Sequence, residues 1–122
     1  MAGPTEQNFS MRAGDDMLLR VTVAADVALT LTGATVRWWM AKTVKKRGDQ
    51  VQLKKSSLSA GGIEITNESE RIFEITLLQG DTLDVKPGEY YHEAEIETSV
   101  GAIATVMFGT MTLEDALVSP EV

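Results

Sequence analysis

The stretch YYHEAEIE, from Tyr90 to Glu97, alternates between two kinds of side chain. One set, Tyr90, His92, Ala94 and Ile96, is aromatic or largely apolar, and the other consists of Tyr91, Glu93, Glu95 and Glu97. Successive side chains of a β-strand point to opposite faces of a sheet. The stretch therefore predicts a strand with one face in a core and the other face toward water.

The same period of two recurs along most of the chain. Turn signals such as Gly61-Gly62 and Pro87-Gly88 separate the runs. Seven or eight short strands at this spacing predict an all-β sandwich or barrel, with one short helical turn around residues 78–83. The other expected strands lie at 17–23, 35–42, 51–53, 63–65, 73–77 and 102–113.

Two residues favour an immunoglobulin-like antiparallel sandwich over other β architectures. Tyr90 follows Asp84 and Gly88 in the pattern D-x-x-x-G-x-Y, the place of a tyrosine that bonds back to the preceding corner in immunoglobulin folds. Trp38 falls in the inward set of an early strand, where these folds carry a core tryptophan. The chain has no cysteine, so the predicted fold lacks the usual disulfide.

The 122 residues are enough for one domain with a core of its own. We expect an N-terminal arm at 1–7, the sandwich at 8–115 and a C-terminal tail at 116–122. The first ten residues, MAGPTEQNFS, lack the basic and apolar regions of a signal peptide, and no apolar run approaches the roughly 20 residues of a membrane span. A membrane partner is therefore not expected, and a cysteine-free chain suits assembly in a cytoplasm.

Charge is unevenly distributed along the sequence. The formal net charge of −7 argues against general nucleic-acid binding. Six of the eleven basic residues nevertheless lie between positions 42 and 55, with one acid, Asp49, among them. These are Lys42, Lys45, Lys46, Arg47, Lys54 and Lys55. This hairpin is either a solvated end with protective lysines or a basic patch that docks on an acidic surface, such as that of a neighbouring copy.

Candidate catalytic chemistry is sparse. His92 is the one histidine, and its place in an inward set favours a hydrogen-bonded core imidazole over a catalytic or metal-binding group. The glutamates of the 90–97 strand form a row that is typical of a solvated face, since a calcium site needs convergent oxygens. No phosphate-binding glycine loop or nucleophile elbow is present. We therefore expect no enzyme activity, no cofactor, no metal and no small-molecule substrate.

Exposed apolar residues point instead to protein contacts. Trp39 and Tyr91 lie opposite the inward sets of their strands, and large exposed aromatic residues tend to mark contact sites. The last strand is apolar on both faces, which suggests cover on both sides or an interface that includes Met107 and Phe108. Trp39 could equally lie beneath the arms or a loop.

Several short motifs resemble small structural proteins of tailed phages. They are Gly14-Asp15-Asp16, Leu31–Val36, Gly61-Gly62-Ile63, Asp81-Thr82-Leu83 with Pro87–Tyr90, and Gly109–Leu113. In order and spacing, over about residues 8–115, they resemble the immunoglobulin-like N-terminal domain of phage baseplate upper proteins and the related fibre-to-tail adaptor proteins. A baseplate protein carries a receptor-binding extension after this domain; we expect none here, which favours a small adaptor, neck or decoration role.

The resemblance implies an oligomeric virion component of the tail, baseplate or neck that anchors a fibre or joins layers. Its partners would be other phage structural proteins and other copies of itself. A capsid decoration protein and a carbohydrate-binding or adhesion module are the alternatives, the latter using Trp39 and Tyr91 as a stacking platform.

Overall fold

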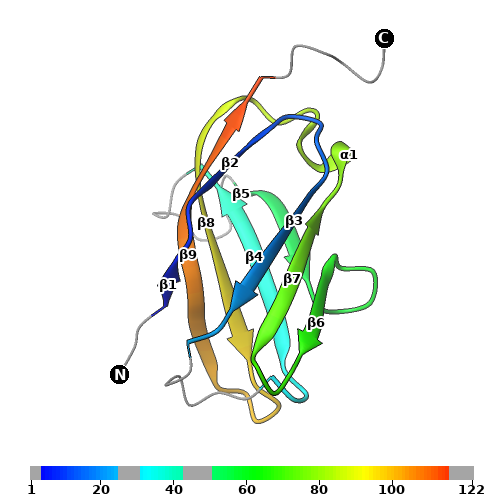
Figure 1. The fold of residues 1–122 in the computed structure, drawn as a ribbon, viewed down its shortest axis with the longest axis vertical. Coiled ribbons are helices and arrows are strands. Elements are labelled where there is room, and N and C mark those ends of the chain that lie inside the picture. The colour runs from blue at the N-terminus through cyan, green and yellow to red at the C-terminus, as the bar shows by residue number, and fades with distance from the viewer. Residues whose placement is uncertain (1–3, 25–30, 43–50, 116–122) are drawn as a thin grey trace.

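The computed structural model describes residues 4–24, 31–42 and 51–115. Their strands form two packed sheets, and one short helix lies at an end of the sandwich (Figure 1). The strands are β1 (Thr5–Glu6), β2 (Phe9–Arg12), β3 (Met17–Thr22), β4 (Thr35–Ala41), β5 (Val51–Ser56), β6 (Ile63–Asn67), β7 (Ile72–Leu77), β8 (Gly88–Glu97) and β9 (Ile103–Glu114). The helix is α1 (Gln79–Thr82).

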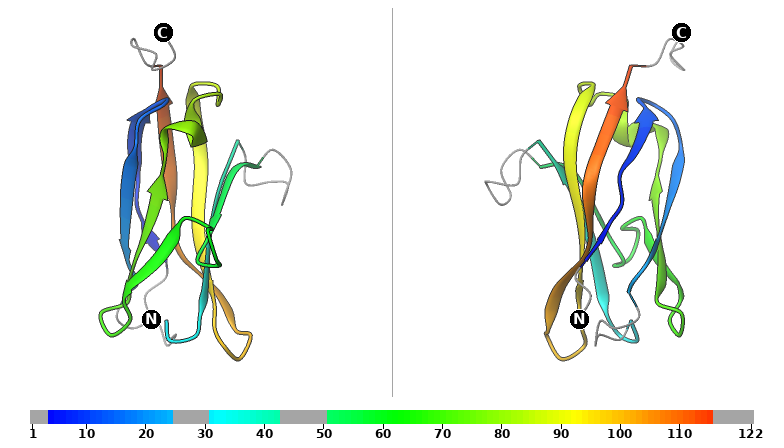
Figure 2. Two further views of the ribbon diagram at one scale, coloured as in Figure 1. Left: turned by 90° about the vertical axis from the view of Figure 1, so that its right-hand side faces the viewer. Right: turned by 60° about the vertical axis from the view of Figure 1, so that its left-hand side comes forward.

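The larger sheet has six strands and the smaller sheet three. In the larger sheet the order is β1-β9-β8-β4-β5, and β2 continues along β9 beyond β1. The smaller sheet has the order β3-β7-β6. All pairs are antiparallel except those of β1 and β2 with β9, which are parallel. The two layers, seen along their edges in Figure 2, make an immunoglobulin-like β-sandwich.

The core follows from the alternation of side chains. In β4 and β8 every second residue is buried, as the sequence predicts. Trp38, Phe73 and Met40 are among the largest side chains with no exposed surface. Burial of these groups takes the place of a disulfide as the source of stability.

The predicted tyrosine corner is present. The hydroxyl of Tyr90 donates a hydrogen bond to the backbone carbonyl of Lys86, four residues earlier. This contact ties the start of β8 to the corner that precedes it. The predicted helical turn also forms, as α1, where Asp81 accepts a hydrogen bond from the backbone N–H of Leu78.

The N-terminal segment differs from the sequence prediction. Thr5–Glu6 forms β1 and pairs with Met107 and Phe108, so this part of the expected arm at 1–7 belongs to the larger sheet. The C-terminal tail at 116–122 lies outside the described residues.

The doubly apolar character of the last strand has a local cause. The pairing of β8 with β9 shifts by one residue at Val106, and both Val106 and Met107 turn into the core.

Candidate protein-interaction surface

The outer face of the larger sheet collects three of the aromatic residues that the sequence singles out. Trp39 lies opposite Glu93, and Glu93 lies opposite Phe108, so these three side chains form one row across β4, β8 and β9. Tyr91 stands two residues along β8 from Glu93 and therefore projects from the same face. Residues that are opposite in register share a face of the sheet. The sequence could not predict that three strands would bring these rings together.

Trp39 is half-buried, and a lysine of the neighbouring strand covers part of it. Lys54 is the register partner of Trp39 on β5, and its Nζ lies 4.2 Å from the centre of the Trp39 ring. An ammonium group over an indole face is attracted by the ring quadrupole. The sequence leaves Trp39 either exposed or covered by the arms or a loop; the structure shows partial burial, with Lys54 of the neighbouring strand over the ring.

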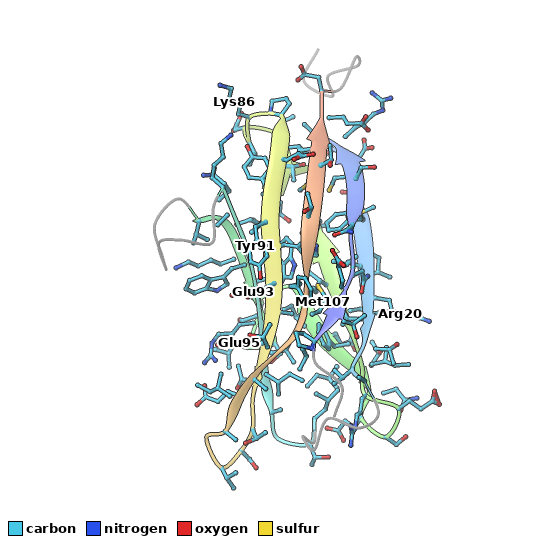
Figure 3. All side chains as sticks on the ribbon, turned by 90° about the vertical axis from the view of Figure 1, so that its left-hand side faces the viewer. Arg20, Lys86, Tyr91, Glu93, Glu95 and Met107 are labelled. Atoms are coloured by element: carbon cyan, nitrogen blue, oxygen red, sulfur yellow. The ribbon has the colours of Figure 1, made fainter. Side chains whose placement is uncertain are left out.

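Carboxylates and one arginine surround the aromatic row. Arg37 lies between two glutamates of β8, with its Nη1 3.0 Å from Glu97 and 3.8 Å from Glu95. The hydroxyl of Tyr91 donates to Glu93 over 3.1 Å. Figure 3 shows Tyr91, Glu93 and Glu95 following one another along β8. The charged groups thus form an ordered rim, with cations on β4 and β5 and anions on β8.

The environment of Tyr91 changes its acidity. Partial burial, and then the neighbouring charge of Glu93 and the hydrogen bond to it, raise the pKa of Tyr91 to about 12. The phenol therefore stays protonated throughout the physiological range. At this surface it acts as a neutral aromatic ring that donates one hydrogen bond.

Two other predicted contact sites have different outcomes. Met107 is fully buried, with 0% of its surface exposed, because the shift at Val106 turns it inward. Met107 is therefore a core residue, and the prediction that it lies at a contact surface is wrong. Lys45, Lys46 and Arg47 lie outside the described residues.

His92 has the hydrogen-bonded core position that the sequence predicts. Its side chain has no exposed surface. The indole Nε1 of Trp38 donates to Nδ1 over 2.9 Å, and Nε2 lies 2.8 Å from the backbone carbonyl of Gln7. These partners select the neutral tautomer protonated on Nε2, since a carbonyl can only accept. Burial lowers the pKa of His92, which keeps the imidazole uncharged.

The described residues show no sign of an ion site or of a membrane-crossing helix. Among the described residues, no three histidine, aspartate or glutamate side chains gather as metal ligands would. Within the same residues, no helix has the length and apolar character needed to cross a membrane. An open hollow of about 810 Å³ beside the β6–β7 turn is lined by polar side chains such as Asn67 and Ser69.

Sequence reasoning missed part of this surface. The sequence places Lys54 in a basic hairpin, whereas in the structure it covers part of the ring of Trp39. Nothing in the sequence singles out Arg37, although it joins two glutamates of β8. Both roles depend on which strands lie side by side, and the sequence gives only the period within each strand.

No protein-family model matches the chain, and no curated protein matches it in sequence. Among solved structures, it is similar to the crystal structure of CopC from Methylosinus trichosporium OB3b, with a TM-score of 0.45 and 10% sequence identity. That alignment covers 97% of this chain and 90% of the other.

Proposed function

We propose that this chain is a non-catalytic assembly module that binds a protein partner through the outer face of its larger sheet. The observation that carries this proposal is the row of Trp39, Glu93 and Phe108, with Tyr91 beside it. Aromatic residues set within a polar, charged rim are typical of the centre of a protein interface. The interior position of His92, with both ring nitrogens bonded, leaves this imidazole without access to a substrate.

The charges on this face suggest the chemistry of the partner. Glu93, Glu95 and Glu97 line β8, and Arg37 compensates part of the charge of two of them. The whole chain carries a net charge of −7. A partner with a basic rim and an apolar centre would therefore approach faster and fit better than an acidic one.

The finer role that we propose is that of an adaptor in the tail, baseplate or neck of a phage particle. Its support is the resemblance of the short motifs between residues 8 and 115 to phage structural proteins. A cysteine-free sandwich suits such a part, because its work is to hold neighbours in place. Capsid decoration is the alternative position in the same kind of particle.

The carbohydrate-binding alternative has less support from the geometry. A sugar stacks on an open aromatic face, whereas Lys54 lies over the Trp39 ring. A glycan array tests this alternative directly, with Trp39→Ala as the control. Sugar binding that disappears in this variant would replace the proposal of a protein partner.

The main test is sedimentation velocity of the chain with each structural protein encoded by the neighbouring genes. Trp39→Ala should weaken the complex by about 30-fold, the effect of losing an interface residue worth roughly 2 kcal/mol. Leu18→Ala is the matched control, because Leu18 is 58% exposed and lies on β3 of the smaller sheet. Equal binding by both variants, or no complex with any of these proteins, would overturn the proposal.

A further inference from the structure

The N-terminal strands lie in a seat built by the edge of β9. Phe9 through Arg12 pair in parallel with Met111 through Glu114, and the short β1 pairs with residues 107 and 108. Between β1 and β2, the backbone N–H of Gln7 donates to the carbonyl of Phe108 over 2.8 Å. We call this edge of β9, together with His92 beneath it, the strand seat. Figure 1 shows β1 and β2 beside β9 along this edge.

A glycine opposite the break between β1 and β2 shapes the seat. A Cβ on Gly109 would lie 2.2 Å from the carbonyl oxygen of Gln7 and 2.8 Å from Oδ1 of Asn8. The next residue, Thr110, donates its backbone N–H to the same Asn8 oxygen over 2.8 Å. The seat therefore fits residues 7 and 8 in particular, since any side chain at position 109 would push them away.

Buried groups beneath the seat also depend on its occupant. The Nε2 of His92 lies 2.8 Å from the carbonyl of Gln7, and the ring of Phe9 meets the imidazole edge-on at 5.1 Å. Met11 is 6% exposed and belongs to the core. An empty seat would leave a buried imidazole donor and the edge of β9 without partners. Some strand has to occupy the seat.

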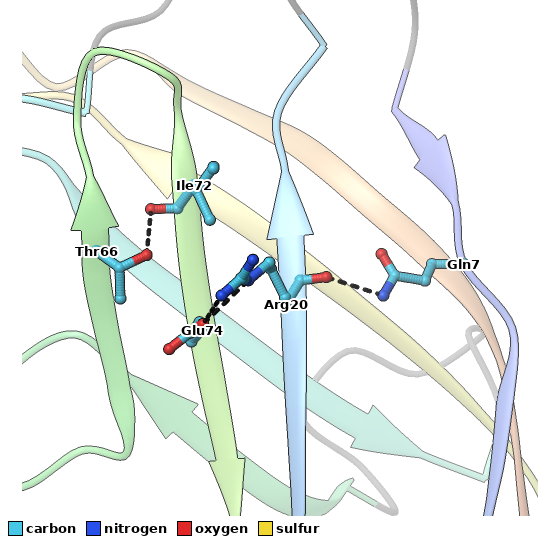
Figure 4. Close-up of polar contacts among 5 residues, drawn as sticks. All are labelled: Gln7, Arg20, Thr66, Ile72 and Glu74. Atoms are coloured by element: carbon cyan, nitrogen blue, oxygen red, sulfur yellow. Dashed lines mark hydrogen bonds and ion pairs between the residues drawn. The ribbon is translucent and has the colours of Figure 1, made fainter.

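The same segment also reaches the smaller sheet. The side-chain amide of Gln7 donates to the backbone carbonyl of Arg20 on β3 over 3.1 Å, as Figure 4 shows. Gln7 thus contacts three parts of the fold: the edge of β9, the buried His92 and the edge of β3. Each of these three contacts uses an atom of Gln7.

One short turn joins this segment to the rest of the sandwich. Between Arg12 and Met17 the chain leaves the larger sheet, reverses and enters the smaller one. Gly14 in this turn has φ of +86°, a conformation that residues with a side chain rarely adopt. If these four residues opened, the whole of 5–12 would move as one unit.

We propose that the protein forms an exchanged dimer, in which residues 5–12 of each copy occupy the strand seat of the other. A second copy supplies a segment with the same sequence, so every contact made to Gly109, His92 and Arg20 is regained between chains. The closed and exchanged forms then differ mainly at the turn, and high protein concentration favours the dimer. This exchange does not depend on a partner at the aromatic face.

The absence of native cysteine allows a direct test by disulfide trapping. In register, Thr112 lies between Ser10 of β2 and Glu89 of β8. Chains with Ser10→Cys and chains with Thr112→Cys are mixed at high concentration, unfolded and refolded together, and then mildly oxidised. The exchange predicts a covalent heterodimer on a non-reducing gel. The double variant in one chain, oxidised when dilute, should form the disulfide within the chain and so verify the register.

The matched control pairs Glu89→Cys chains with the same Thr112→Cys chains. Because β8 and β9 form one hairpin, this pair should give only the background of random collisions. A yield of Ser10–Thr112 heterodimer severalfold above that background supports the exchange, whereas a yield equal to it overturns the proposal. Gly14→Val should raise the yield, because it strains the turn in the closed form only; an unchanged or lower yield in this variant would contradict the hinge at Gly14.

Discussion

Acidification should destabilise the fold through His92, because this buried imidazole is neutral in the folded state. Burial lowers its pKa below the usual value of 6.5, which applies to the unfolded chain. Protons therefore bind the unfolded state more readily. The contribution of neutral His92 to the stability is complete above pH 6.5, and it declines as the pH falls from 6.5 toward the pKa of the folded state.

The size of this effect follows from proton linkage. One group that titrates only in the unfolded state changes the free energy of unfolding by about 1.4 kcal/mol per pH unit. Between pH 6.5 and pH 5, His92 can therefore remove at most about 2 kcal/mol. The hydrogen bond of 2.9 Å from Trp38 Nε1 to Nδ1 acts in the same direction within this limit, because a protonated Nδ1 could not accept it.

His92→Gln is the comparison that isolates this group. Its side-chain amide can donate from Nε2 and accept at Oε1, as the neutral imidazole does with Gln7 and Trp38, but it does not titrate in this pH range. Urea unfolding of both proteins at pH 7.5, 6.5 and 5.0 gives their difference in stability, from which the titration of the carboxylates cancels. This gap, the free energy of unfolding of the original chain minus that of the variant, should be largest at pH 7.5 and smaller by up to about 2 kcal/mol at pH 5. A gap that stays constant over this range would refute the role of His92.

Three further changes probe other parts of the fold. Tyr90→Phe removes the corner hydrogen bond and should lower the free energy of unfolding in urea by about 1 kcal/mol with an unchanged slope; an equal midpoint would contradict it. Gly109→Ala pushes the backbone of β9 away from that of residues 7 and 8 and should lower the free energy of unfolding by about 1–3 kcal/mol, with faster amide exchange in residues 5–12. A stability equal to that of the original chain would contradict the close fit at Gly109. Arg20→Gln breaks an ion pair of 2.9 Å to Glu74, and the side chain of Arg20 is 67% exposed. The free energy of unfolding, measured by thermal unfolding, should therefore fall by less than about 1 kcal/mol, and a larger loss would contradict this reasoning.

The sequence predicted the strands that obey a simple alternation. The stretch from Tyr90 to Glu97 is a strand of the larger sheet with its alternate residues buried, and the hydroxyl of Tyr90 makes the corner bond. These features depend on the period within one segment and on a turn close in sequence. Such local patterns predict the structure well, because the alternation within a strand determines which of its faces is buried.

The features that the sequence did not predict depend on distant pairings. Thr5–Glu6 is too short and polar to show a strand period, and it forms a strand because β9 offers a free edge. The shift at Val106 turns Met107 inward, although alternation alone cannot tell a bulged strand from one with two covered faces. The contact of Lys54 with Trp39 likewise needs β4 and β5 to be neighbours in a known register.

The position of the strand seat has a consequence for the aromatic face. The strand order β1-β9-β8-β4-β5 places β8 between the β9 edge and the β4 strand that carries Trp39. An exchange of residues 5–12 restores the pairing along β9, so the row of Trp39, Glu93 and Phe108 keeps its neighbours in each copy. An exchanged dimer would therefore carry two copies of this face, held together by the exchanged segments. Two linked faces raise the apparent affinity for a multivalent partner without any new contact. For an assembly module, that gain would be the use of the exchange.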